Sequence, residues 1–292
     1  MQQLIDKARV LIEALPYISQ FRGRTVVVKI GGAALEDHEL RRRFAEDVIL
    51  LDWVGIDVVV VHGGGKQITT MLDRLGLEPT FVNGMRVTDE ATLEVVEMVL
   101  GGSLNQELVR LINHLGGRAV GLTGKDGNLA RARRAGGTPD LGLVGEVTSV
   151  DRRVLDQLMH DFVPIIAPLA TGEDGTTLNI NADVFAARLA AAVGAEKLVL
   201  LTDVQGVKGA TGELLSTISA DEAEALIASG VISGGMIPKV EYALGAIADG
   251  VRKVHIIDGR LEHALLLEIF TQAGVGTQVV GGATPKSQER AI

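Results

Sequence analysis

The sequence contains no cysteine and few aromatic residues, which make up 3% of its 292 positions. Without cysteine the chain has no disulfide framework, no thiolate nucleophile and no cysteine-based metal site. No apolar run approaches the roughly 18 residues of a membrane-spanning helix. Asp6, Lys7, Arg9 and Glu13 interrupt the apolar pattern that a signal peptide requires. We therefore expect a cytoplasmic protein with no membrane partner.

Positive charge is also scarce, since 28 Lys and Arg face 37 Asp and Glu for a formal net charge of −9. A surface of this sign argues against broad electrostatic binding to nucleic acid. An anionic ligand would need a local basic pocket, for which Lys29, Arg86 and Lys239 are candidates. The hydrophobic content of 47% indicates a large core, either one α/β domain or two joined lobes.

The common phosphate and hydrolase motifs are missing as well. HGGGK at 62–66 has neither the spacing nor the Ser/Thr of a P-loop, and no GxGxxG follows a predicted strand. HExxH, GxSxG and the HRD and DFG motifs of protein kinases do not occur. Any phosphate chemistry must therefore come from a dispersed set of residues.

Apolar runs of strand length alternate with segments of helical periodicity. Continuous Val/Ile/Leu runs are typical of strands buried on both faces of a parallel sheet. The predicted strands are 25–30, 57–61, 118–122, 162–167, 197–202, 253–257 and 277–280. The predicted helices are 38–54, 66–75, 89–115, 151–160, 182–193, 220–229, 236–249 and 261–273, with 80–88 extended and 125–150 forming hairpins. We predict an α/β fold, a three-layer αβα sandwich around an open, largely parallel sheet.

The N-terminal segment 2–15 has an apolar stripe at helical spacing, and Pro16 is expected to end this helix. The stripe either packs on its own domain or docks on another subunit, because this helix is not needed to complete a βαβ unit. We therefore treat residues 1–20 as a separate helix. A break near 193–196 separates a first lobe, 21–193, from a smaller second lobe, 194–292.

Two predicted strands each end in a glycine cluster beside a basic residue, VVVKIGG at 26–32 and VVVVHGGGK at 58–66. Open α/β sheets bind ligands at the carboxyl ends of their strands. Glycines there allow backbone N–H groups to approach an anion closely. Lys29 lies within the first strand, where an unpaired buried ammonium would be costly, so this pairing predicts a polyphosphate site.

Three further segments contain polar residues that stand out. Arg86 in NGMRVTD could clamp a carboxylate, although an arginine after a turn is more often a surface residue. LNINAD, which contains Asn179 and Asp183, has more polar groups than one helix cap needs, while Asn181 itself fits a cap. Lys239 begins a predicted helix and could equally be a solvated lysine.

These segments together resemble the amino-acid kinase family, and within it the acetylglutamate branch. The motifs occur in the family's order from residue 24 onward: VVVKIGG, VVVVHGGG, NGMRVTD, GLTGKDG, LNINAD, LLTDVQGV and GGMIPK. NGMRVTD and LNINAD favour the acetylglutamate branch over relatives that act on aspartate, uridylate or carbamate. The resemblance implies ATP and N-acetyl-L-glutamate as substrates in arginine biosynthesis. Kinases of another carboxylate, such as an aminoadipate derivative, and a non-catalytic arginine or nucleotide sensor remain alternatives.

By matching motif, the resemblance assigns the phosphoryl path to three charged residues and a turn. Lys29 and Lys239 would contact the phosphoryl oxygens, and Asp183 would orient both lysines. Gly31 and Gly32 would place backbone N–H groups on the phosphate. The family's usual GGNAM reads GGAAL here, which keeps these glycines and changes the packing beside them.

The remaining assignments concern the two substrates. Gly64 and Gly65 would donate N–H groups to the phosphoryl group and acceptor, while Arg86 and Asn179 would hold the acetylglutamate. Asp203 in LLTDVQG would lie by the nucleotide. An acceptor carboxylate with a pKa of about 4 is already ionised, so the transfer needs alignment and charge neutralisation rather than a general base. Mg²⁺ would be held mainly by phosphates and water, and we name no protein ligand.

A second resemblance concerns regulation. The N-terminal helix ending in LPYISQF and the stretch HIIDGRLEHALLLEIFTQAGVGTQV are similar to the arginine-inhibited subtype, a hexamer arranged as a trimer of dimers. The resemblance implies an arginine site at His255, Glu268 and Gly274, interlaced N-terminal helices, and a nitrogen-regulatory protein as a candidate partner. The alternative for Glu268 is the solvated face of a helix.

Overall fold

The computed structural model describes residues 1–82, 84–272 and 274–282. Its centre is an eight-stranded sheet in the order β12-β14-β13-β11-β1-β2-β8-β5. These strands are β1 Thr25–Ile30, β2 Asp57–His62, β5 Ala119–Thr123, β8 Val163–Ala167, β11 Lys197–Thr202, β12 Thr217–Ser219, β13 Lys253–Asp258 and β14 Thr277–Val280. All neighbouring pairs are parallel except β13 with β14. The predicted open, largely parallel sheet is therefore confirmed.

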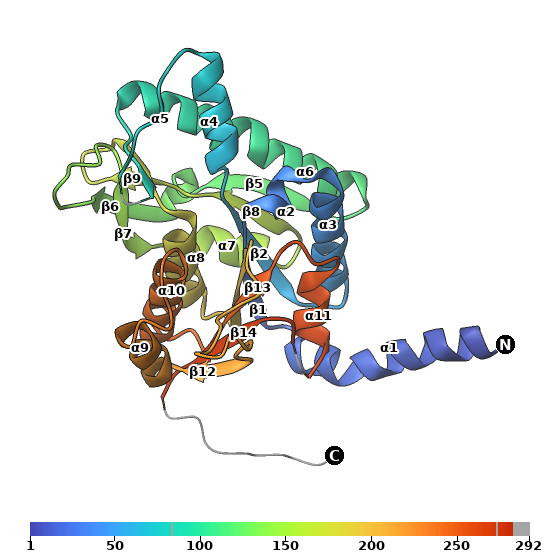
Figure 1. Ribbon diagram of the computed structural model, residues 1–292. Helices are drawn as coiled ribbons and strands as arrows, with labels where there is room; N and C mark the ends of the chain where they lie inside the picture. Colours follow the sequence, from blue (N-terminus) through green and yellow to red (C-terminus); the bar gives the residue numbers. More distant parts are fainter. Residues whose placement is uncertain (83, 273, 283–292) are drawn as a thin grey trace.

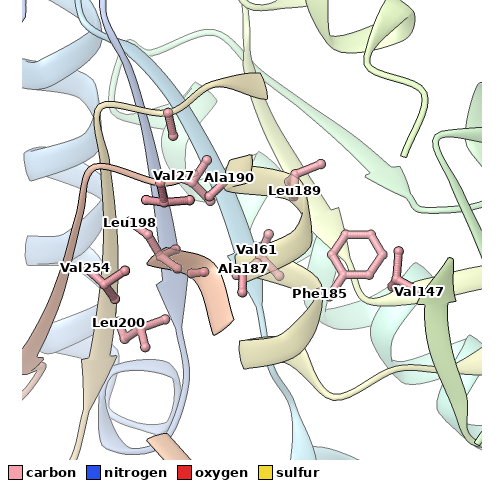
Figure 2. Packing of buried hydrophobic residues seen from close by; sticks show 14 of the residues in the cluster. Val27, Val61, Val147, Phe185, Ala187, Leu189, Ala190, Leu198, Leu200 and Val254 are labelled. Atoms are coloured by element: carbon pink, nitrogen blue, oxygen red, sulfur yellow. The ribbon is translucent and has the colours of Figure 1, made fainter. Parts of the chain in front are cut away.

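Helices cover both faces of this sheet (Figure 1). Figure 2 shows Ala187 and Ala190 beside apolar strand residues such as Val27 and Val61, while Phe185 lies beside Val147. Alternate residues of each strand belong to different apolar clusters, as expected for strands buried on both sides. One face carries α8 Ala182–Val193, α9 Ala220–Ala228 and α10 Met236–Ala248, and the other α3 His38–Trp53, α6 Asn105–His114 and α11 Ala264–Phe270.

Smaller elements surround one end of the sheet. A four-stranded sheet has the order β10-β9-β6-β7, and β3 pairs with β4. The antiparallel pair of β6 and β7 confirms the hairpin predicted within 125–150. β9, β10 and β12 were not predicted, because strands of three or four residues carry too little pattern. The bounds are β3 Phe81–Val82, β4 Met85–Arg86, β6 Ala130–Arg134, β7 Gly145–Val150, β9 Leu169–Gly172 and β10 Thr177–Asn179, with helices α2 Ala33–Glu36, α4 Gly65–Arg74, α7 Arg153–Leu158 and η2 Asp126–Asn128.

The N-terminal helix α1 spans Gln2–Phe21, so the expectation that Pro16 ends it was wrong. Proline removes one backbone hydrogen bond, but the turn beyond it is anchored in the core. Phe21 is 4% exposed and Tyr17 packs against the same cluster. The earlier turns project from the body (Figure 1), and Leu4, Leu11 and Leu15 are exposed there.

The helix predicted over 89–115 is not α-helical throughout. α5 Glu90–Val96 runs into a π-helical segment, Glu97–Leu104, which continues as α6. Gly101 and Gly102 lie in this segment and weaken its preference for the α form. Such π segments are frequent at functional sites, and this one packs beside the second glycine turn.

The central sheet crosses the predicted lobe boundary without interruption, because β1 of the first lobe pairs with β11 of the second. The division into 21–193 and 194–292 stays a prediction. Residues 283–292 of the second lobe lie outside the described residues, as does Asn83 of the NGMRVTD motif. Among the described residues, no helix combines the length and the apolar character needed to cross a membrane.

Candidate functional site

Lys29 and Asp183 form a buried ion pair at the carboxyl end of the central strand β1. The Lys29 Nζ lies 2.9 Å from the Asp183 Oδ1, and each residue is 9% exposed. Asp183 is on the first turn of α8, which begins where Asn181 accepts hydrogen bonds from the N–H groups of Asp183 and Val184. The carboxylate compensates the cost of burying the ammonium, and the capping prediction for Asn181 is confirmed.

Asp203, which follows the neighbouring strand β11, contacts the glycine turn Gly31–Gly32 at the end of β1. Its Oδ1 accepts a hydrogen bond of 2.9 Å from the Ala33 N–H. Gly32 has a φ of 56°, and a Cβ there would lie 2.3 Å from the Asp203 Oδ2. Only glycine fits this position. A Cβ on Gly31 would lie 2.8 Å from the Lys29 Nζ, so both glycines of the motif make room for charged groups.

Lys239 is half-buried on the first turns of α10. Among the described residues, the ion-pair partner of Asp183 is Lys29 alone, so the structure does not bring the second predicted lysine into contact with Asp183. Tyr242 lies one helical turn after Lys239, and burial, together with the charges of Asp183 and Glu241, raises the pKa of its hydroxyl. α10 packs against α8, the helix that carries Asp183.

A cavity of about 220 Å³, here called the Arg86 cavity, lies beside the second glycine turn. The Arg86 Nη2 donates 2.9 Å to the Gly65 carbonyl and 2.8 Å to the Thr69 hydroxyl, and the guanidinium stacks 4.6 Å from the Phe81 ring centroid. The buried Nη1 has no partner among the described residues. Because such a donor is costly to leave unpaired, the geometry indicates an acceptor supplied by a ligand. Asn179, Gly63 and Gly64 line the same cavity.

A larger cavity of about 480 Å³, here called the Asp203 cavity, opens at the carboxyl end of β11. Asp203 is the one carboxylate among the described residues that line it, which also include Gly206, Lys208, Ile232, Met236 and Arg260. The sequence pattern did not single out Lys208 or Arg260, since both follow strands in loops of ordinary composition. Arg260 is anchored on the Asp258 carboxylate at 2.8 Å.

A third cavity of about 300 Å³, the Glu268 cavity, lies at the other end of β11. His255, Glu268 and Gly274 line it together with Lys197 and Tyr17. The structure thus brings the three predicted regulatory residues together, and Glu268 is 6% exposed rather than solvated.

Charges inside the Glu268 cavity perturb one another. The His255 Nδ1 lies 2.5 Å from the Glu268 Oε1, and the Glu268 Oε2 accepts 2.9 Å from the Val275 N–H. Burial lowers the pKa of Lys197 to about 8, although Glu268 acts in the opposite direction. Burial also lowers the pKa of His255. Lys197 was missed by the sequence reasoning, yet it carries the same signal as Lys29, a lysine within a buried apolar strand.

Comparison with known proteins identifies the family. Residues 24–258 match the model of the amino acid kinase family. The chain belongs to this family. Among curated members, the acetylglutamate kinase of Acinetobacter baylyi is 55% identical over 97% of each chain. That of Desulfotalea psychrophila is 52% identical over 96% of this chain and 98% of its own. The family resemblance seen in the motifs is confirmed.

Solved structures support the same fold. The N-acetylglutamate synthase of Neisseria gonorrhoeae in complex with coenzyme A and N-acetyl-glutamate superposes with a TM-score of 0.84 at 30% identity over 94% of this chain. This chain spans 64% of the length of that synthase. Carbamate kinase of Giardia lamblia, at 17% identity and a TM-score of 0.63, shares the fold.

Proposed function

We propose that this member of the amino acid kinase family transfers the γ-phosphoryl group of ATP to the side-chain carboxylate of N-acetyl-L-glutamate, forming an acylphosphate. The observation that carries the proposal is the position of Lys29. Its strand β1 lies between β2, which ends at the Arg86 cavity, and β11, which ends at the Asp203 cavity. A buried ammonium between an acceptor cavity and a nucleotide cavity would lie beside the negatively charged phosphoryl group as that group passes from ATP to the acceptor. The names of the 55% and 52% identical relatives support this choice of acceptor.

The chain's residues neutralise and align rather than transfer protons. The acceptor carboxylate is ionised at neutral pH, and the unpartnered Arg86 Nη1 can bind one of the ligand's acidic oxygens. Lys29 faces the transferred phosphoryl group, with Asp183 fixing its ammonium. Lys239 approaches the leaving phosphate from α10 when the ligands are bound. Backbone N–H groups of the two glycine turns supply further preorganised donors.

Mg²⁺ fits the Asp203 cavity. Such an ion is typically bound by one or two carboxylates together with substrate phosphates and water, and Asp203 supplies one carboxylate there. Its Oδ1 is engaged by the Ala33 N–H, so most ligands would come from phosphates and water. The ion would neutralise charge on the phosphate oxygens.

A hydroxylamine-trapping assay tests the proposal. With Mg-ATP and N-acetyl-L-glutamate, we expect hydroxamate formation that depends on both substrates. Product with an aminoadipate derivative but not with acetylglutamate would move the acceptor to a longer carboxylate. No product with any acceptor would contradict the kinase proposal and favour a non-catalytic sensor of arginine or nucleotide.

We further propose that L-arginine binds in the Glu268 cavity and inhibits the enzyme. The buried Glu268 carboxylate can pair with a guanidinium, and polar residues such as Gln272, Gln278 and Thr271 line the cavity. A synthase structure that is 28% identical was determined in complex with coenzyme A and L-arginine. Including arginine in the trapping assay tests this point, because inhibition is expected and an unaffected rate would contradict it.

Removing residues 1–20 is expected to dissociate a hexamer, a trimer of dimers, into dimers. The reason is the exposed apolar surface of α1, where Leu4 and Leu11 are 64% and 70% exposed. Side chains of this kind gain about 1.5–3 kcal/mol each when fully buried. Sedimentation velocity measures the change.

The full-length variant Leu11→Asp serves as the control for this deletion. It keeps Tyr17, which packs on the core, and is expected to sediment as the deletion does. An unchanged profile in both variants would contradict the role of α1 in assembly. A nitrogen-regulatory protein remains a candidate partner, and its addition in the same experiment would reveal a heavier complex.

A further inference from the structure

His62, the last residue of β2, is fully buried directly before the glycine turn of the Arg86 cavity. Its Nδ1 lies 2.8 Å from the Gly63 carbonyl oxygen, and its Nε2 lies 3.2 Å from the Asn105 Nδ2. The phosphoryl transfer proposed above uses no histidine as a base. Both ring nitrogens have partners, as burial of an imidazole requires, and one of these partners is the backbone of the glycine turn itself.

Asn105 fixes the tautomer of this ring. Its Nδ2 donates 2.8 Å to the Ile165 carbonyl and lies 3.3 Å from the Leu122 carbonyl, and both groups can only accept. The amide nitrogen must therefore face inward, toward His62. The Nδ1 faces a carbonyl oxygen, which can only accept, so the proton is on Nδ1 and is donated to the Gly63 carbonyl. The Nε2, which faces the amide nitrogen, then carries the lone pair. Burial lowers the pKa of His62 to about 4, which agrees with a neutral ring.

This hydrogen bond also determines the direction of the next N–H group. In a planar trans peptide the C=O and the following N–H point in opposite directions. With the Gly63 carbonyl held toward the buried ring, the Gly64 N–H points away from it. No protein acceptor among the described residues receives this N–H, and Gly64 lines the Arg86 cavity.

The π-helical segment restrains the same turn from its other side. A Cβ on Gly64 would lie 2.5 Å from the Leu100 side chain and 2.9 Å from that of Leu104. The turn is thus held between the imidazole and two leucines. Asn105, which follows the π segment directly, orients the imidazole, so one helix supplies both restraints.

We propose that His62, oriented by Asn105, is a positioning residue that keeps the Gly63–Gly64 peptide turned so that the Gly64 N–H donates to the reacting oxygens. The inference rests on the proposed function, in which this N–H contacts the phosphoryl group or the acceptor. His62 would thereby stabilise the transition state through the Gly64 N–H and would transfer no proton itself.

Two substitutions of His62 separate its two hydrogen bonds. H62N keeps an amide N–H near the position of Nδ1 and loses the acceptor for Asn105. H62Q keeps an acceptor near the position of Nε2 and loses the donor to Gly63. We expect H62N to retain kcat within about threefold, while H62Q loses about 100-fold, the size of effect seen when one oxyanion donor is removed. The KM for ATP is expected to stay within about twofold in both.

Thermal unfolding is measured on both variants. If His62 had only a structural role, both variants would lose kcat to the same extent, and the variant with the lower Tm would have the lower kcat. That result would overturn the proposal. Unchanged kcat in H62Q would also overturn it. In the wild type, ¹⁵N NMR of the imidazole is expected to show the neutral Nδ1–H tautomer, and an Nε2–H tautomer would contradict the assignment.

Crystal structures of the two variants distinguish failure of this inference from failure of the proposed function. If the wild-type enzyme does not phosphorylate acetylglutamate, the proposed function fails, but the peptide can still be examined. The Gly63 carbonyl is expected to keep its direction in H62N and to turn in H62Q. An unturned carbonyl in H62Q would refute the positioning role whatever the activity.

Discussion

Replacing Lys29 with alanine is expected to lower kcat for acetylglutamate phosphorylation by about 10³-fold. Lys29 is the buried cation of β1, and its strand lies between the strands that end at the Arg86 and Asp203 cavities. Water that fills the space of the ammonium cannot offer a fixed positive charge to the phosphoryl oxygens. Steady-state rates with saturating ATP and acetylglutamate give the value.

The control for this variant is Lys66→Ala. Lys66 follows the second glycine turn, but its ammonium pairs with Glu36 and its side chain is 68% exposed. Its removal is expected to leave kcat within twofold. Lys29→Ala leaves Asp183 buried without its partner, so a lower Tm is expected in a chain that still folds. Turnover within tenfold of the wild type in folded Lys29→Ala would remove the role assigned to this lysine.

The second large effect is expected at the opposite end of β11. Glu268→Gln should raise the arginine concentration for half-inhibition by about 10- to 150-fold, because a hydrogen bond to a charged group contributes about 1.5–3 kcal/mol. Glutamine can still accept from the Val275 N–H, so the cavity keeps its shape. The inhibition curve of each variant is measured relative to its own uninhibited rate.

The exposed Glu224 of α9 provides the matched control. Glu224→Gln makes the same chemical change outside the Glu268 cavity and is expected to be inhibited as the wild type is. Equal inhibition of Glu268→Gln and the wild type would mean that the guanidinium of the bound arginine does not pair with Glu268. Relief of inhibition in both variants would indicate an effect of overall charge rather than of this site.

The parts of the fold that were predictable are those whose burial is uniform. β1 and β11 have the bounds predicted for them, because a strand covered on both faces is largely apolar and ends at a polar or glycine turn. The end of α1 was mispredicted because Pro16 dominates locally, whereas Tyr17 and Phe21 are held by residues distant in sequence.

Within the candidate site, the sequence indicated charged residues that lie in apolar segments. Lys29 stood out because an ammonium in an apolar strand needs a partner, and Asp183 lies at 2.9 Å. The cradle around Arg86 was less predictable, since the stacking of Phe81 and the contact with Thr69 depend on how β3 and α4 meet. The proton position on His62 required the carbonyls of two further strands, which no local pattern encodes.

β11 carries Lys197 at one end and leads to Asp203 at the other, and all six of its residues are buried. The first residue of β11 therefore lines the Glu268 cavity, and the residue directly after β11 lines the Asp203 cavity. A one-residue insertion or deletion within this strand would turn the side chains beyond it to the opposite face of the sheet. One of the two cavities would then lose its charged residue. The number of residues between Lys197 and Asp203 is therefore constrained by both cavities at once.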